Sequence, residues 1–168
     1  MLVREPGGTQ ASERIRELVA DPGVQLEPVA ELLLFCAARA QLTSEVIRPA
    51  MEAGRDVVCD RFSDSTAAYQ GAARGISVEV AVSVSELATG GLRPDLTVLL
   101  RIEPEEAAER RGAEDRFERE GIELQRHVAG AYEKLAQWDP DRIKVVDGAG
   151  SVEEVHGRVI DVVERASS

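Results

Sequence analysis

Apolar and polar residues alternate along this chain with two different periods. Four short apolar runs, at residues 1–3, 56–60, 96–102 and 143–147, each stop at a charged or turn residue. Such runs are typical of buried parallel strands. The segments between them carry apolar residues every three or four positions, the period of an amphipathic helix. Strands alternating with helices predict an α/β fold with a doubly wound parallel sheet, in which the run 96–102 is expected to be central.

Capping and turn residues set the limits of the predicted helices. Thr9 or Ser12 can cap the first helix, and the second begins near Pro28. The second helix gathers its apolar residues on one stripe, formed by Val29, Leu32, Leu33, Cys36, Ala37 and Ala40. Further helices are expected over residues 43–53, where Pro49 opens the last segment, from 63 or 64 to between 71 and 75, from 78 to 90–91, and from 122 to 139–140. Ser151 and Glu154 form a capping box that opens the closing helix.

Composition restricts the kinds of partner. The length of 168 residues suits one domain, and the net charge of −11 argues against a nucleic-acid backbone as the main partner. A small anion held by local arginines remains compatible with this charge. Cys36 and Cys59 lie in separate apolar stretches, which favours buried reduced thiols over a disulfide or metal site. The sequence contains neither a membrane-length apolar run nor a signal-like N-terminus, so we expect a cytoplasmic protein.

Polar chemistry begins where the second apolar run ends, at Asp60-Arg61. In open α/β sheets, ligands bind at the carboxyl edge of the strands. A carboxylate there can serve a metal-bound or protonated group, and a guanidinium can hold phosphate oxygens. In the other interpretation, Asp60 caps the next helix and Arg61 is solvated. The dipeptide alone leaves both interpretations open.

Two further features also admit two interpretations each. Phe35 and Arg39 lie four residues apart and off the apolar stripe of their helix, where they can stack on a planar ring and bind its edge. They can equally pack together, with the ring under the arginine stem. The charge-dense segment from Glu103 is either a solvated helix face or, near residues 109–120, a lid that brings arginine to a phosphate.

Six motifs resemble those of bacterial thymidylate kinases, and they match in order and spacing along nearly the whole chain. They are REPGGT at 4–9, LLLFCAARAQ at 32–41, VIRP at 46–49, DRFSDSTAAYQG at 60–71, ATGGLRPDLTVLL at 88–100 and DRFE at 115–118. The resemblance implies a P-loop nucleoside monophosphate kinase-like fold over residues 1–168. It also implies transfer of a phosphoryl group from ATP, with Mg²⁺, to dTMP, giving dTDP for dTTP synthesis.

The resemblance implies roles for five residues at the base and sugar of the acceptor. Phe35 would stack on thymine and Arg39 would reach a base oxygen. Thr66 would face the base, Tyr69 would crowd the sugar where a ribonucleotide carries its 2′-hydroxyl, and Gln70 would help to close the pocket.

Five more residues are implied at the phosphates. Arg4 and Arg61 would hold the acceptor phosphate, with Asp60 beside them. In the lid, Arg111 would reach the transferred group, and Arg116, in the DRFE motif, is a second catalytic candidate. Positioning two anions and neutralising their charge is most of what phosphoryl transfer requires. The metal ligand stays unassigned, with Asp60 as a candidate acting through a water molecule.

The sequence departs from the family pattern in two places. Phe62 stands where the family usually has tyrosine, and no G-x-x-x-x-G-K-[ST] motif occurs, because the only lysines, Lys134 and Lys144, do not follow a glycine. We therefore expect the N-terminal strand, the P-loop and the first helix of the fold to be missing. The chain as given is then expected to be inactive, since the cradle for the donor phosphates and the hydroxyl ligand of Mg²⁺ are absent.

Three explanations of this departure are open: a misassigned start, a true truncation that gives an inactive kinase, or a paralogue that binds nucleotide without catalysis. The expected partners are dTMP and ATP, without nucleic acid or membrane. The resemblance further implies a homodimer, for which the helix around Val29 to Ala40 or Val78 to Ala88 can supply the interface.

Overall fold

The computed structural model describes residues 1–109 and 121–166. Within these ranges the chain forms two compact units, one described over residues 1–93 and the other over 94–109 and 122–166. Strands and helices alternate along the chain as predicted, and both strand pairs are parallel. Parallel pairing follows from this order, because neighbouring parallel strands require a crossover connection, usually a helix.

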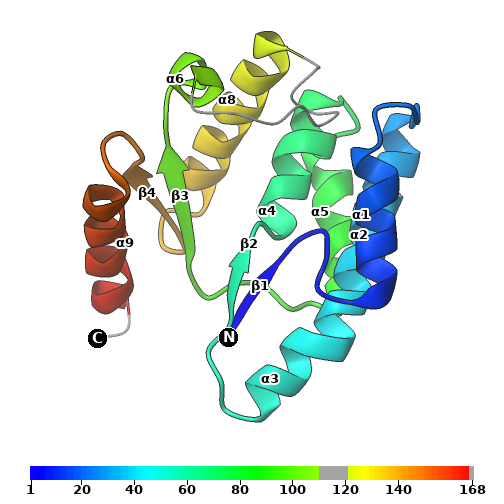
Figure 1. Ribbon diagram of the computed structural model, residues 1–168, viewed down its shortest axis with the longest axis horizontal. Coiled ribbons are helices and arrows are strands. Elements are labelled where there is room, and N and C mark those ends of the chain that lie inside the picture. Colours follow the sequence, from blue (N-terminus) through cyan, green and yellow to red (C-terminus); the bar gives the residue numbers. More distant parts are fainter. Residues whose placement is uncertain (110–120, 167–168) are drawn as a thin grey trace. The chain divides into compact units, whose positions relative to one another are not determined.

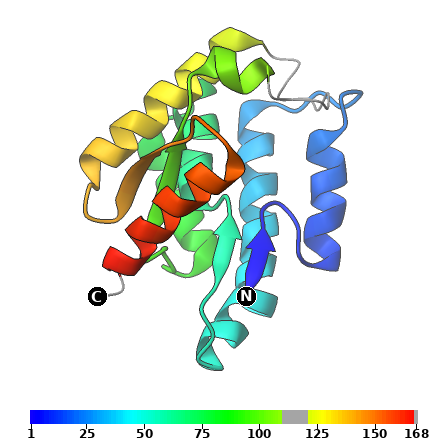
Figure 2. The same cartoon turned by 60° about the vertical axis from the view of Figure 1, so that its left-hand side comes forward.

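The first unit contains one pair of strands and several helices. In chain order the elements are β1 Leu2–Arg4, α1 Gln10–Ala20, α2 Pro28–Leu42, η1 Thr43–Ile47, α3 Arg48–Glu52, β2 Val58–Asp60, α4 Ser63–Thr66, η2 Ala67–Ala73 and α5 Val78–Thr89. β1 and β2 lie side by side, with Leu2 opposite Val58 and Arg4 opposite Asp60 (Figure 1). Helices α1 and α2 pack against each other (Figure 2).

Several predicted helix ends are confirmed. The Thr9 hydroxyl caps α1 by accepting a hydrogen bond of 3.1 Å from the Ser12 amide, and α2 begins at Pro28. Gly90 ends α5 with a left-handed φ of 58°, which glycine adopts at little cost. The interpretation of Asp60 as a cap is wrong, because α4 begins after Phe62 and no side chain caps it. The turn after β2 is occupied by Arg61 instead.

The predicted helix over 43–53 exists but contains a π-helical segment, η1, before α3. Pro49 lies in the first turn of α3, as expected. A proline has no amide hydrogen and its ring clashes with the carbonyl four residues earlier, which favours a wider turn just before it.

The core of the first unit consists of two apolar clusters. Leu32, Cys36 and Ala81 join α2 to α5, and Leu42, Ile47 and Phe62 form the second cluster. The predicted apolar stripe of α2 is only partly buried. Its members Val29 and Leu33 are exposed, whereas Glu31 and Arg39 of the same helix are buried. Hydrophobicity alone therefore does not determine which side chains of α2 are buried. Two charged side chains are buried because each has a partner of opposite charge.

The second unit consists of β3 Thr97–Arg101, α6 Pro104–Glu109, α8 Ile122–Trp138, β4 Ile143–Asp147 and α9 Val152–Ala166. The bounds of β4 are those predicted, and the capping box of α9 is confirmed by the bond of 2.8 Å from the Ser151 amide to the Glu154 carboxylate. Strand β3 pairs with β4 alone among the described residues, so its expected central position is not observed. An apolar run indicates that both faces of a strand are covered, but it does not count the neighbouring strands.

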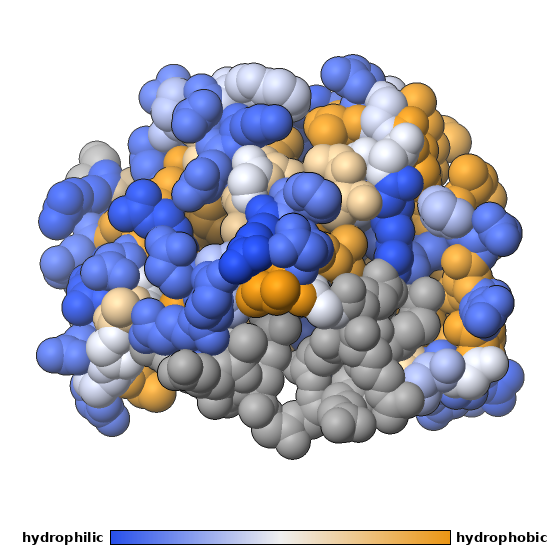
Figure 3. Space-filling view, turned by 90° about the horizontal axis from the view of Figure 1, so that it is seen from above, coloured by the Kyte–Doolittle hydropathy of each residue, from blue (hydrophilic) through white to orange (hydrophobic). Residues whose placement is uncertain are grey.

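The four described strands form two sheets of two strands each, whereas the pattern predicts a single doubly wound sheet. Within the described ranges, no helix is both long and apolar enough to cross a bilayer. On the face seen in Figure 3, hydrophilic residues predominate and hydrophobic residues gather in smaller groups between them.

Candidate functional site

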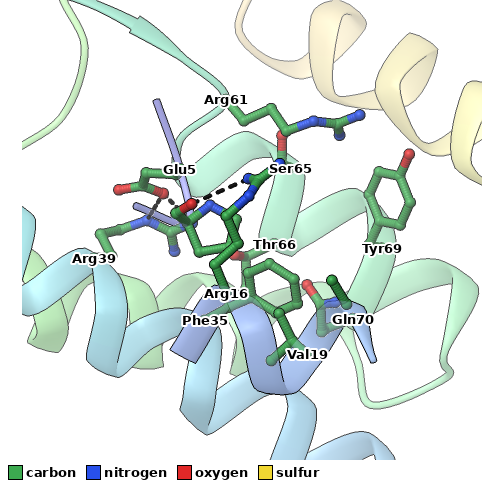
Figure 4. A pocket seen from close by; sticks show the side chains of 12 residues that line it. Glu5, Arg16, Val19, Phe35, Arg39, Arg61, Ser65, Thr66, Tyr69 and Gln70 are labelled. Carbon is green, nitrogen blue, oxygen red and sulfur yellow. Dashed lines mark hydrogen bonds and ion pairs between the residues drawn. The ribbon is translucent and has the colours of Figure 1, made fainter. Parts of the chain in front are cut away.

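A pocket in the first unit collects residues from the turn after β1 and from α1, α2, α4 and η2 (Figure 4). The lining residues are Glu5, Pro6, Arg16, Val19, Ala20, Phe35, Arg39, Arg61, Ser65, Thr66, Tyr69 and Gln70. Six of the sequence-predicted site residues therefore line one pocket, namely Phe35, Arg39, Arg61, Thr66, Tyr69 and Gln70. They come from two motifs, one ending at residue 41 and the other beginning at residue 60.

One side of the pocket offers apolar surface. The ring of Phe35, from α2, lies beside Val19, from α1 (Figure 4). Val19 is fully buried and fixed in the helix pair, whereas Phe35 is half-buried. A partly exposed aromatic ring on a rigid helix can stack on a planar ligand ring.

Arg39 is buried one helical turn after Phe35 and binds three other parts of the unit. Its Nε and Nη2 both lie 2.8 Å from Glu5 Oε2, and Nη1 donates to Ser85 Oγ at 3.1 Å. Nη2 also donates to the Phe62 carbonyl at 3.2 Å, and the guanidinium carbon lies 5.3 Å from the centre of the Phe62 ring. The arginine thus packs on Phe62 and links the turn after β1, helix α5 and the turn after β2.

These bonds bear on the predicted contact between Arg39 and a base oxygen. A guanidinium has five N–H groups, and the bonds to Glu5, Ser85 and Phe62 use both Nη atoms and Nε. A ligand contact would have to use a remaining Nη hydrogen at the pocket wall. The contact stays a prediction.

Glu5 is the acidic partner of Arg39 in the pocket wall. Burial raises the pKa of this carboxyl above its ordinary value of 4.5, and the Arg39 cation offsets that rise only in part. Its other oxygen, Oε1, is buried and accepts no hydrogen bond from the described residues. A buried carboxylate oxygen without a donor is costly, so this atom is a ready acceptor for a donor group in the pocket.

Arg61 and Tyr69 line the part of the pocket opposite Glu5 (Figure 4). The Arg61 guanidinium carbon lies 5.4 Å from the centre of the Tyr69 ring, which restricts where the cation can move. Arg61 has a φ of 65°, a left-handed conformation that costs a residue with a Cβ roughly 1–2 kcal/mol. Such strain is concentrated at functional sites, and here it directs the guanidinium from the end of β2 into the pocket.

Of the four remaining predicted residues, the two that the structure describes, Arg4 and Asp60, are not part of the pocket wall. Arg4 does not line the pocket, and both of its Nη atoms bind the Glu13 carboxylate at 3.2 Å. Asp60 is exposed at the end of β2 and is also absent from the pocket wall. Arg111 and Arg116, with the lid to which they were assigned, fall outside the described residues. The roles of these four residues stay predictions.

Sequence reasoning missed several lining residues. Glu5 lies inside the REPGGT motif, but its neighbour Arg4 was singled out instead. Arg16 lies three residues before Val19, and its Nη1 donates to the Pro6 carbonyl at 3.1 Å. The spacing of Arg16 and Val19 on one helix face was the available signal. Ser65, within the 60–71 motif, had no signal of its own.

In the part of the chain that the structure describes, no group of three or more histidine, cysteine, aspartate or glutamate side chains is placed to hold a metal ion. Cys36 and Cys59 are free thiols, as expected. Burial raises the pKa of Cys59 to about 12, and its Sγ donates to the Arg61 carbonyl at 3.0 Å. This cysteine therefore supports the strained turn rather than serving as a nucleophile.

Comparisons with known proteins connect this pocket to a family. A family model described as thymidylate kinase matches residues 1–159. The chain belongs to the thymidylate kinase family. It is 44% identical to the thymidylate kinase of Deinococcus radiodurans, over 94% of this chain and 78% of that protein. It is 46% identical to the thymidylate kinase of Symbiobacterium thermophilum, over 98% and 78% of the two chains.

The crystal structure of thymidylate kinase from Ehrlichia chaffeensis matches with a TM-score of 0.81 and 29% sequence identity, covering 98% of this chain and 80% of that one. The α/β fold is therefore that of the P-loop nucleoside monophosphate kinases, as the family resemblance predicted. In the thymidylate kinase family the pocket around Phe35 becomes the candidate site for the nucleotide that accepts the phosphoryl group.

Proposed function

We propose that this protein transfers a phosphoryl group from ATP to dTMP, producing dTDP for dTTP synthesis. One observation carries the proposal: Phe35 from one motif and Arg61 and Gln70 from another line a single pocket in a chain of the thymidylate kinase family. The pocket combines an aromatic surface, amide and hydroxyl groups, and a cation, which are the groups that a nucleoside monophosphate requires.

Each side of the pocket receives a part of dTMP in this proposal. The thymine ring stacks on Phe35, with Val19 behind it, and its polar edge faces Thr66 and Gln70. Tyr69 lies against the deoxyribose and leaves no room for a 2′-hydroxyl. Arg61 holds the phosphate, with Arg4 as a second cation that must first leave Glu13. The acceptor is thereby positioned in line for attack on the donor.

The donor half of the site is proposed to lie outside these 168 residues. The sequence contains no G-x-x-x-x-G-K-[ST] motif, and such a loop cradles the phosphates of ATP and supplies a hydroxyl ligand for Mg²⁺. Arg111 and Arg116 provide charge for the transferred group but do not replace the loop. Hence the 168-residue chain binds dTMP without measurable ADP release in a coupled assay. The chain joined to such a loop segment releases ADP, and Arg61→Ala abolishes that release.

We also propose a cytoplasmic homodimer. Helices α2 and α5 pack together and carry four exposed apolar side chains, Val29, Leu33, Val80 and Leu87, of which Leu87 is 84% exposed. A second copy of the same helices would cover this apolar surface in a self-complementary interface. Analytical ultracentrifugation of the Leu87→Glu variant and of the unchanged protein tests this interface. A charge at the interface should shift the variant from dimer toward monomer.

Calorimetry tests the acceptor site directly. The unchanged chain should bind dTMP and bind dCMP more weakly. Phe35→Ala should weaken dTMP binding by about 1–3 kcal/mol through lost stacking and burial. Trp138→Ala is the matched control, because this aromatic is exposed on α8 in the other unit and should not affect binding. Equal affinity for dTMP and dCMP would contradict the proposed base pocket.

A further inference from the structure

Three polar residues form a network that includes the pocket residue Gln70. Glu31, on α2, is 1% exposed although it carries a carboxylate. Gln70 Nε2 donates to Glu31 Oε1 at 2.7 Å. Arg74 donates to the same carboxylate through Nε at 3.1 Å and through Nη2 to Oε2 at 3.1 Å. Gln70 alone of the three lines the pocket.

This network fixes which end of the Gln70 amide faces Glu31. An ionised carboxylate only accepts hydrogen bonds, so it can be satisfied by the NH₂ group of an amide but not by the carbonyl oxygen. Arg74 pairs with Glu31 and maintains it in the ionised form that imposes this choice. Figure 4 shows the consequence, since the carboxamide oxygen of Gln70 lies on the side of the Phe35 ring.

The local helix geometry makes the arrangement possible. Gln70 belongs to the π-helical segment η2, and Arg74 is the residue that ends it. Two residues four apart lie on nearly the same side of a helix, in the π form as in the α form. Gln70 and Arg74 therefore both reach the one carboxylate on α2.

We propose that Glu31 is a positioning residue for base selection. It acts through Gln70, and Arg74 supports it by keeping its charge. The inference rests on the proposed function and deepens it. An acceptor oxygen beside the aromatic ring complements a base whose ring nitrogen carries hydrogen, as in the imide of thymine or uracil. Cytosine places an unprotonated ring nitrogen at the same position, so two acceptors would oppose each other. Since the site is buried, that mismatch leaves both atoms without a donor.

A single substitution separates this role from simple packing. Glu31→Gln keeps the size of the side chain, but a glutamine can donate as well as accept, so the Gln70 amide is free to turn. We expect the ratio of dissociation constants for 5-methyl-dCMP and dTMP to fall by about tenfold, because the turned amide removes one hydrogen-bond mismatch with cytosine. The two nucleotides share the methyl group and differ only on the polar edge.

Two controls accompany the titrations. Glu133→Gln makes the same chemical change on the exposed face of α8 and should leave the ratio unchanged. If Glu31 only stabilises the fold, Glu31→Gln weakens the binding of both nucleotides equally. The ratio of the two dissociation constants then stays constant, and this result would overturn the inference. If the unchanged protein binds neither nucleotide, the proposed function fails instead.

A measurement on the unchanged protein keeps the proposal testable if Glu31→Gln does not fold. The Gln70 side-chain NH₂ protons should give nuclear Overhauser effects to the Glu31 methylene groups, with and without dTMP. Effects from these protons to the Phe35 ring instead would mean that the amide presents its NH₂ group to the pocket, and would overturn the assignment.

Discussion

Arg39 in the first unit and Arg126 in the second have the same kind of partner in very different surroundings. The Arg39 side chain is 2% exposed and pairs with Glu5, which is 4% exposed. Arg126 is 51% exposed and pairs with Glu105 and Glu123, both of which are largely in solvent. Exposed pairs contribute little to stability, whereas a buried pair must stay complete, because either partner alone is an uncompensated charge.

The comparison also shows what the buried pairs do for the pocket. Glu5 with Arg39, and Glu31 with Arg74, pair charges at or beside the pocket wall. On the surface of the other unit, Arg126 of α8 pairs with Glu105 of α6 and with Glu123 of its own helix. Water can replace the exposed pairs at little cost. It cannot enter the buried ones without changing the pocket, so the polar groups of the wall keep one arrangement.

The largest expected effect comes from breaking a buried pair. Arg39→Met keeps much of the volume but leaves Glu5 charged and buried, and leaves Ser85 and the Phe62 carbonyl without this donor. The free energy of unfolding in urea should fall by about 3–5 kcal/mol. Arg126→Met makes the same change at an exposed pair and should leave the denaturation midpoint unchanged. Similar losses in the two variants would remove the distinction between the regions.

The sequence predicted the helices and strands well, because the apolar patterns and capping residues that define them involve residues close together in the chain. The bounds of β4, the start of α2 at Pro28 and the caps at Thr9 and Ser151 all depend on residues within a few positions of each other. The local pattern did not predict the division into two pairs of strands, because an apolar run does not report how many strands flank it. The π-helical segments were missed because they depart from the regular helical period.

The sequence predicted many of the residues that line the candidate site, but not the hydrogen bonds that these residues form. Phe35, Thr66 and Tyr69 were identified and line the pocket. The partners of Arg39 were missed, because they lie between 23 and 46 residues away along the chain and no local pattern connects them. Glu31 was missed for a similar reason, since an acidic residue next to Leu32 is usually on the solvated face of a helix.

An intermediate effect is expected from two helical glycines, with opposite signs in the two units. A Cβ on Gly71, in η2, would lie 2.9 Å from Val78 Cα and 3.2 Å from the Ser77 carbonyl oxygen, both backbone atoms that cannot move cheaply. Gly71→Ala should therefore destabilise the protein by about 1–3 kcal/mol.

Gly130 provides the matched case in α8, where an added Cβ meets nothing within 4 Å. Gly130→Ala should stabilise the protein by about 0.5–1 kcal/mol, because alanine restricts the unfolded chain and favours the helix. Thermal unfolding of both variants followed by circular dichroism decides the matter. If the unfolding temperature rose in both variants, the packing around η2 would be looser than these distances indicate.

The smallest effect concerns the protonation of two glutamates. Burial raises the pKa of Glu5 above 4.5, while the hydrogen bond from Arg126 lowers the pKa of Glu105 below 4.5. The folded state therefore holds the Glu5 proton more tightly than the unfolded chain does. The contribution of Glu5 to stability is complete below its unfolded pKa and is lost as the pH rises through its folded pKa. Glu105 acts in the opposite direction, and its contribution is lost as the pH falls.

Carbon-13 NMR titration of the side-chain carboxyls measures both residues in one experiment. The Glu5 midpoint should lie above 4.5 and the Glu105 midpoint below it. Arg126→Met should return Glu105 toward 4.5, since its main stabilising donor is lost. Arg39→Met should move Glu5 further upward, because only the attraction to Arg39 opposes the effect of burial. A Glu5 midpoint below 4.5 in the unchanged protein would mean that the ion pair outweighs burial. The buried and exposed pairs would then differ in degree rather than in kind.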